Sequence, residues 1–238
     1  MPKPSNIVKL LTEFDQVITG SDIEQMIDKA LSLLLNRFNF DRIFLSVFFL
    51  EKNTSTLFAR DIASTELVIK KNIKNDGGEI KRILSLKAPL YKNNSSLQKI
   101  FDPLKQHFSD SHIRSYLTIP LLSASNRIGL LSFCSREIDG INDDLHEILL
   151  LLSRRLTVSL QLVLQQETLN EKVMAQLASE KQYQELIEQA GDAILKGKKG
   201  GNIIQVNQAA LQLSGYSQAE LTSMNISDLF SREMLNKK

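Results

Sequence analysis

Cysteine is almost absent from this chain of 238 residues, which contains only Cys134. One cysteine cannot form an internal disulfide, and it cannot supply a metal site built from several thiolates. Proline and glycine are scarce as well, with 5 and 10 copies, so the composition is not that of a disordered low-complexity chain. Since stable disulfides belong to oxidising compartments, we expect a cytoplasmic protein, and we expect no metal site.

The chain also lacks a strong net charge and a long apolar run. Lys and Arg total 29 against 27 acidic residues, and this balance gives no broad positive field of the kind that binds phosphate backbones. The N-terminus lacks the order of a signal peptide, and the apolar stretch at 148–152 is far shorter than the roughly 20 residues that span a bilayer. We therefore expect no nucleic-acid partner and no direct membrane contact.

Hydrophobic residues make up 42% of the chain, enough for a packed core, and the length favours one large domain or two small ones. Apolar residues at helical spacing predict two helices, over 7–18 and 23–34. Branched and aromatic residues predict strands over 42–50, 56–62, 113–122 and 127–135. Residues 76–106 permit no assignment.

A long helix is expected from Asn142 or Asp143 onward, where a polar side chain can cap it. Its apolar positions follow a spacing of four and three residues that is typical of a coiled-coil seam. These seam positions are Leu145, Leu149, Leu152, Leu156, Val163, Val173 and Leu177. A helix of roughly 40 residues would be about 60 Å long, more than one small domain covers, so we expect a homodimer through residues 143–188. The alternative is two helices broken near 165–170.

Two segments, IRSYLTIPLL at 113–122 and NRIGLLSFCSRE at 126–137, resemble the last hairpin of GAF domains, where an S-x-L-x-x-P-L strand meets an x-I-G-x-L strand. The segment INDDL at 141–145 resembles the opening of that family's final helix, and FDRI at 40–43 resembles the entry to its first strand. The resemblance covers about residues 10–164. It implies a six-stranded sheet module that binds small molecules or serves for dimerisation.

The segments YQELIEQAGDAIL at 183–195, GNIIQVNQAALQLSGY at 201–216 and SQAEL at 217–221 are similar to the opening of PAS domains. The later PAS strands are expected to be missing. The fold class we expect is α+β: a GAF-like antiparallel sheet flanked by helices, a long signalling helix and a partial PAS-like segment. The expected domains are a sensor at 1–164, a helical linker at 165–182 and a truncated PAS domain at 183–238.

Side chains alternate between the two faces of a strand, and one face of the expected sheet is consistently apolar, suited to lie beneath the helices: Ile43, Leu45, Val47, Phe49, Leu117, Ile119, Leu131 and Phe133. The other face mixes aromatic, hydroxyl and charged residues, as a small-molecule pocket does. Its candidate ligand-binding residues are Phe44, Ser46, Phe48, Phe58, Arg60, Tyr116, Thr118, Ser132 and Cys134. A half-solvated sheet face would have the same composition, so both interpretations stay open.

No catalytic residues are expected, and the ligand or cofactor is unknown. The cyclic-nucleotide signature of GAF domains is absent, Cys134 lacks the neighbouring His of a bilin site, and a thiol-exchange reductase would need more cysteines. The pair His146-Glu147 lacks the flanking residues of a phospho-accepting or zinc-binding helix, and 191–198 has the wrong spacing for a phosphate loop.

The resemblance implies a non-catalytic sensory module of bacterial signal transduction, which relays the state of the GAF domain through the helix to PAS and to an effector outside this chain. A sensor histidine kinase of a two-component system is the effector we favour. The alternative is a ligand-free dimerisation scaffold within a transcription activator or a diguanylate cyclase.

Overall fold

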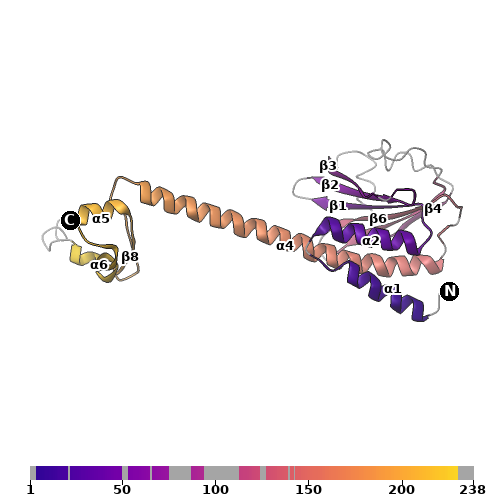
Figure 1. Cartoon of the computed structure of the whole chain (residues 1–238), viewed down its shortest axis with the longest axis horizontal. Coiled ribbons are helices and arrows are strands. Elements are labelled where there is room, and N and C mark those ends of the chain that lie inside the picture. The colour runs from indigo at the N-terminus through magenta and orange to yellow at the C-terminus, as the bar shows by residue number, and fades with distance from the viewer. Residues whose placement is uncertain are drawn as a thin grey trace. The chain divides into compact units, whose positions relative to one another are not determined.

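The computed structural model describes residues 4–20, 22–49, 53–64, 66–74, 87–93, 113–123, 127–138, 140–141 and 143–229. The chain divides into two compact units, Met1–Glu167 and Thr168–Lys238, each of which mixes helices with strands (Figure 1). The α+β class is confirmed, whereas the finer division at residues 164 and 182 stays a prediction.

The first unit is built on a six-stranded sheet in the order β3-β2-β1-β6-β5-β4. Every strand pair is antiparallel. The strands are β1 Arg42–Phe49, β2 Thr54–Asp61, β3 Val68–Lys74, β4 Leu90–Asn93, β5 Ser115–Leu122 and β6 Arg127–Ser135. The four predicted strands are confirmed as β1, β2, β5 and β6.

The two edge strands were not predicted from the sequence. Strand β3 reads VIKKNIK and exposes most of its side chains, and β4 is only four residues long. Charged and short edge strands discourage pairing with other chains, and for the same reason they lack the apolar alternation by which a strand is predicted. Most of the unassigned stretch at 76–106 lies outside the described residues.

Helices cover one face of this sheet (Figure 1). They are α1 Pro4–Val17, α2 Ile23–Arg37 and the first part of α4 Asp143–Gln189. The side chain of Asp22 caps α2 by accepting a hydrogen bond from Gln25 N at 3.0 Å. The main core forms between these helices and the sheet, and it contains Phe14 of α1, Leu34 of α2 and Phe133 of β6. The set predicted to lie beneath the helices packs here, with Phe49 only partly buried.

Gly129 allows the central strands β1 and β6 to approach closely. It pairs with Val47 of β1, and a Cβ atom at this position would lie 2.1 Å from the backbone oxygen of Ser46. No side chain fits there, so the glycine of the x-I-G-x-L segment is required by strand packing.

Helix α4 is continuous over 47 residues, so the expected continuous helix is confirmed and the alternative break near 165–170 is wrong. Among the described residues, no helix combines the length and the apolar character needed to cross a membrane.

The second unit contains the two-stranded sheet β7-β8 and three short helical segments. Its elements are β7 Leu195–Gly197, β8 Ile203–Val206, α5 Gln208–Ser214, α6 Gln218–Ser223 and the 3-10 helix η3 Ile226–Leu229. Ser217 and Glu220 form a reciprocal capping box at the start of α6. A small core contains Ile203, Val206, Ala210 and Leu221.

Candidate functional site

The face of the six-stranded sheet that lies opposite the helices forms a second apolar cluster. Phe44, Tyr116 and Cys134 belong to it, together with Leu57 and Ala59 of β2. Phe48 lies on the same face and is buried, whereas Ser46 is half-buried. Because these side chains are buried, the interpretation as a half-solvated face is wrong.

A pair of hydroxyl groups lies in the middle of this face. Thr118 of β5 and Ser132 of β6 are direct cross-strand partners, and their Oγ atoms form a hydrogen bond of 2.9 Å. Both residues are buried. Phe44 of β1 is the neighbour of Ser132 on its other side, so an aromatic ring and two hydroxyls share one cross-strand row on this face. That they bind a ligand stays a prediction.

Two predicted pocket residues, Phe58 and Arg60, lie on the helix face instead. Phe58 pairs with Leu45, and Arg60 pairs with Ile43, so both share a face with the main core. Phe58 packs in that core, and Arg60 forms an ion pair with Asp28 of α2. The prediction was wrong because side chains alternate with a period of two, so an error of one residue in the register of β2 exchanges its two faces.

A buried ion pair that the sequence analysis missed lies at one end of the second cluster. Arg42 donates from Nη2 and Nε to Oδ2 of Asp61, at 2.5 and 2.8 Å, and the two residues are only 6% and 5% exposed. The guanidinium also lies 5.9 Å from the centre of the Phe44 ring. Alternation from Phe44 would have placed Arg42 on this face, but no sequence signal indicated that Asp61 is its partner.

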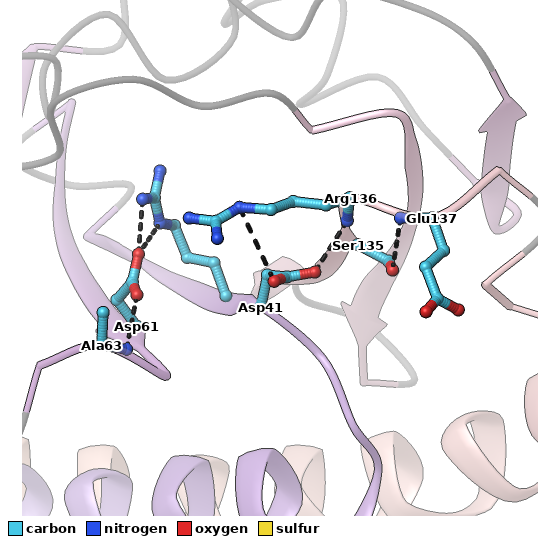
Figure 2. A network of polar contacts seen from close by, with 7 residues as sticks. Asp41, Asp61, Ala63, Ser135, Arg136 and Glu137 are labelled. Atoms are coloured by element: carbon cyan, nitrogen blue, oxygen red, sulfur yellow. Dashed lines mark hydrogen bonds and ion pairs between the residues drawn. The ribbon is translucent and has the colours of Figure 1, made fainter.

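Neighbouring polar contacts fix the same end of the sheet (Figure 2). Asp61 Oδ1 accepts a hydrogen bond of 2.8 Å from Ala63 N. Asp41, immediately before β1, accepts one of 2.7 Å from the backbone N of Arg136 after β6, and the Arg136 side chain lies 3.7 Å from the other carboxylate oxygen. These bonds hold the start of β1 against the end of β6, and thus position Arg42.

Cys134 pairs with Arg42 across β1 and β6 and is completely buried. Burial raises the pKa of its thiol to about 12, against a smaller lowering by Arg42 and a further rise from Asp41. The thiol is therefore protonated at neutral pH, and a protonated, inaccessible thiol is a poor nucleophile and a poor metal ligand. In the described part of the chain, His, Cys, Asp and Glu nowhere gather into a group of three that could hold a metal ion.

Comparison with known proteins agrees with this architecture. Residues 181–236 match the family model described as PAS domain. The GAF domain of a phosphoenolpyruvate-protein phosphotransferase from Coxiella burnetii superposes with a TM-score of 0.56 at 14% identity, covering 70% of this chain and 99% of that one. The corresponding Acinetobacter domain gives a TM-score of 0.54 at 11% identity, with 67% and 94% covered.

The chain has a GAF fold followed by a PAS-like segment. A bacteriophytochrome from R. palustris also matches, with a TM-score of 0.52 and 11% identity over 74% of this chain and 42% of its own. Because these sequence identities are low, the similarity shows only that the first unit has the same fold as these proteins. No curated protein sequence matches the chain.

Helix α4 contributes to the core of the GAF unit along its first part. Leu149, Leu152 and Leu156 are fully buried in that core, Val163 is nearly so, and Leu145 packs against it. These five residues were predicted as part of a dimer seam, and this is wrong because they already face the sheet. Heptad spacing marks one face of a helix but does not distinguish a sheet from a second helix as the partner of that face. Only the last two seam residues, Val173 and Leu177, are exposed.

Within the second unit, Asn207 joins the end of α4 to the PAS-like segment. Its Oδ1 caps α5 by accepting from Ala210 N at 3.0 Å and also accepts from Ile194 N at 2.9 Å. Its Nδ2 donates to Ile187 O at 2.9 Å and to Asp192 O at 3.0 Å. Asn207 is completely buried, so one side chain satisfies backbone groups of the helix end, the strand entry and α5.

Proposed function

We propose that this chain is a non-catalytic sensory and signal-relay module, in which the GAF unit responds to a small molecule and α4 carries the response to the PAS-like segment. GAF and PAS domains occur in signal-transduction proteins. The observation that carries the proposal is the second cluster, which places the Thr118–Ser132 hydroxyl pair beside Phe44.

The chemistry of this face suits a ligand that is mostly apolar and carries a few polar groups. Aromatic and aliphatic side chains supply buried area, and sparse hydroxyls orient the bound molecule. The Arg42–Asp61 pair lies at one end of the same face and makes that end charged. A planar guanidinium and a carboxylate each recognise polar groups of fixed geometry. The candidates for ligand contact are therefore Phe44, Phe48, Tyr116, Thr118 and Ser132.

The proposed relay of the signal depends on α4, because this helix is attached both to the GAF core and to the PAS-like segment. Its first part packs in the GAF core through Leu149, Leu152 and Leu156, and its last turn is bonded to Asn207. A ligand that shifts the sheet against this helix would move a continuous element, since packed interiors change arrangement in discrete steps. We propose that the helix acts in a homodimer, and that the effector outside this chain is a sensor histidine kinase. The cytoplasmic location suggested by the low cysteine content belongs to the same proposal.

Native mass spectrometry of the purified full chain tests the sensing role. We expect a co-purified small molecule that is retained by the wild type and lost in Thr118→Val, which removes one hydroxyl at nearly constant volume. Ser153→Ala is the matched control, because Ser153 is equally buried but donates to Leu149 O within α4, and it should retain the molecule.

A bare protein in the same measurement would contradict the sensing role and favour the alternative, a ligand-free dimerisation scaffold. Loss of the molecule from the Ser153→Ala control as well would also contradict it, because binding would then depend on general stability and not on the second cluster. The exposed apolar residues of α4 are the observation that favours a scaffold as the second candidate.

A further inference from the structure

Helix α4 carries an exposed row of apolar residues that is separate from its core-facing row. We name this row the outer stripe; it consists of Leu151, Val158, Leu162, Leu169 and Val173, all of which are exposed. Leu151, Leu162 and Val173 recur at intervals of 11 residues, as do Val158 and Leu169. An 11-residue repeat corresponds to about 3.67 residues per turn, close to a straight α-helix, so these side chains stay on one face over the whole length.

The second half of α4 has no cover from its own chain within the described residues. Every residue from 165 to 186 is exposed. Most helices in proteins are stabilised by packing of an apolar face and not by intrinsic helix propensity. The outer stripe begins on the part of α4 that packs in the GAF unit and continues into the uncovered part, so it is the face on which a partner would stabilise the helix.

We infer that the outer stripe is a self-association surface, on which the outer stripe of a second copy packs with the two helices parallel and in register. This inference rests on the proposed homodimer and identifies its surface. Side chains of two helices interlock continuously only when both helices carry the same repeat. A second copy of α4 necessarily carries the same repeat, so we take it as the partner that packs on the outer stripe.

The parallel orientation follows from the order of residues along the stripe. In register, each of the five apolar residues meets its own copy, and Gln165 and Gln166 meet theirs, where their amides can hydrogen-bond to each other. An antiparallel pair that keeps Leu162 against Leu169 would instead place Leu151 opposite Glu180. The parallel pair therefore matches more apolar positions.

Size and charge set the expected strength of the dimer. From Leu151 to Val173 the stripe is about 33 Å long at 1.5 Å per residue, and two helices in contact along that length form an interface at the small end of the range for stable dimers. In a parallel pair Arg154 lies near its own copy, whereas the charge of Arg155 is offset by its ion pair with Asp15 of α1. We therefore expect a concentration-dependent dimer that added salt strengthens, because salt screens the repulsion between like charges.

Sedimentation velocity of the full chain over a range of concentrations tests the surface. Leu162→Glu should weaken self-association at least tenfold, because it places a charge against its own copy in the middle of the stripe. Met174→Glu is the matched control, since Met174 is 69% exposed and Leu162 61%, but Met174 lies on another face of α4. The Met174→Glu dimer should dissociate over the same concentration range as the wild-type dimer. Far-UV circular dichroism should show wild-type helix content for Met174→Glu at every concentration. For Leu162→Glu it should match the wild type at low concentration, where both proteins are monomeric.

Each outcome decides a separate claim. If Leu162→Glu dimerises as well as the wild type, the outer stripe is not the interface, although the homodimer of the proposed function survives. A wild type that stays monomeric at several hundred micromolar would overturn both the dimer and its surface. Equal weakening by Met174→Glu would also overturn the assignment to this stripe.

A disulfide tests the orientation, because the only native cysteine, Cys134, is buried and unreactive. Under mild oxidation Val173→Cys should form a covalent dimer in a parallel pair, since each new thiol then meets its own copy. In the antiparallel pair residue 173 faces residue 158 of the other copy, and no such disulfide can form. Failure to cross-link in a sample that still dimerises would overturn the parallel arrangement.

Discussion

Replacing Asn207 by alanine should loosen the connection between α4 and the PAS-like segment while leaving the GAF unit unchanged. The side chain is completely buried and makes four hydrogen bonds of 3.0 Å or less, two to backbone N–H groups and two to backbone carbonyls. Alanine can form none of these bonds, so the four backbone groups must either become accessible to water or stay unpaired.

The magnitude follows from the two kinds of bond. Loss of an N-cap side chain costs about 1 kcal/mol, and each buried backbone group left without a partner costs about 1–3 kcal/mol. Some of the orphaned groups can reach water, so we expect a total loss of about 3–4 kcal/mol in the local opening free energy. Since about 1.4 kcal/mol corresponds to a factor of ten, amide protection in this region should fall by a factor of several hundred.

Hydrogen exchange measured by mass spectrometry on the full chain gives the local reading that is needed, because it reports opening segment by segment. Exchange should accelerate in peptides covering 187–212 and stay unchanged in peptides from the six-stranded sheet. Asn202→Ala is the control: Asn202 is exposed and accepts one side-chain hydrogen bond, from Asn225 at 3.0 Å, so its protection should change little.

A second substitution separates the two roles of the side chain. Asn207→Asp keeps the oxygen that accepts from Ile194 N and Ala210 N but removes the donor to Ile187 O and Asp192 O. We expect α5 to stay protected while the last turn of α4 opens more easily. Wild-type exchange in Asn207→Ala, or equal loosening of α5 and α4 in Asn207→Asp, would refute this account of the junction.

Three further predictions concern the GAF unit. Gly129→Ala should lower the free energy of unfolding by more than about 2 kcal/mol, because its Cβ would lie 2.1 Å from Ser46 O; calorimetry that found a wild-type melting temperature would contradict this close approach. Cys134 should resist thiol reagents in the folded chain at pH 8 and react on unfolding, and rapid labelling of the native state would show that it is accessible. Burial raises the pKa of this thiol from 9.0 to about 12, so above pH 9 the thiol ionises more readily in the unfolded chain. The free energy of unfolding should therefore fall as the pH rises from 9 toward 12. Cys134→Ala should remove the part of this fall that is due to the thiol.

Local sequence patterns were sufficient wherever one segment determines its own structure. Gly215 ends α5 in a left-handed conformation with φ of 73°, and Asn207 caps the same helix, which are the positions that glycine and asparagine favour at helix ends. The alternation of β1, β5 and β6 placed Phe44, Tyr116 and Ser132 on one face correctly. These features depend on neighbouring residues alone, and such residues are close together in the unfolded chain as well.

Pairing between distant segments was where prediction from the sequence failed. Phe58 and Arg60 were placed on the wrong face of the sheet because the register of β2 against β1 is set by strand packing, not by the composition of β2. The Arg42–Asp61 pair joins residues 19 positions apart, and neither side chain shows in the sequence which partner it takes. An error of one residue in register therefore changed the assignment of a whole strand.

The sequence by itself indicated an α+β unit and a long helix, because periodicity and capping show which side chains of one element share a face, and its resemblance to PAS domains indicated the PAS-like segment. Only the tertiary structure decided what lies against each face. The row of α4 from Leu145 to Val163 faces its own sheet, and the outer stripe stays exposed. The physical reason is that apolar side chains are buried equally well by any close-packed neighbour, so their spacing along a helix does not specify which neighbour buries them.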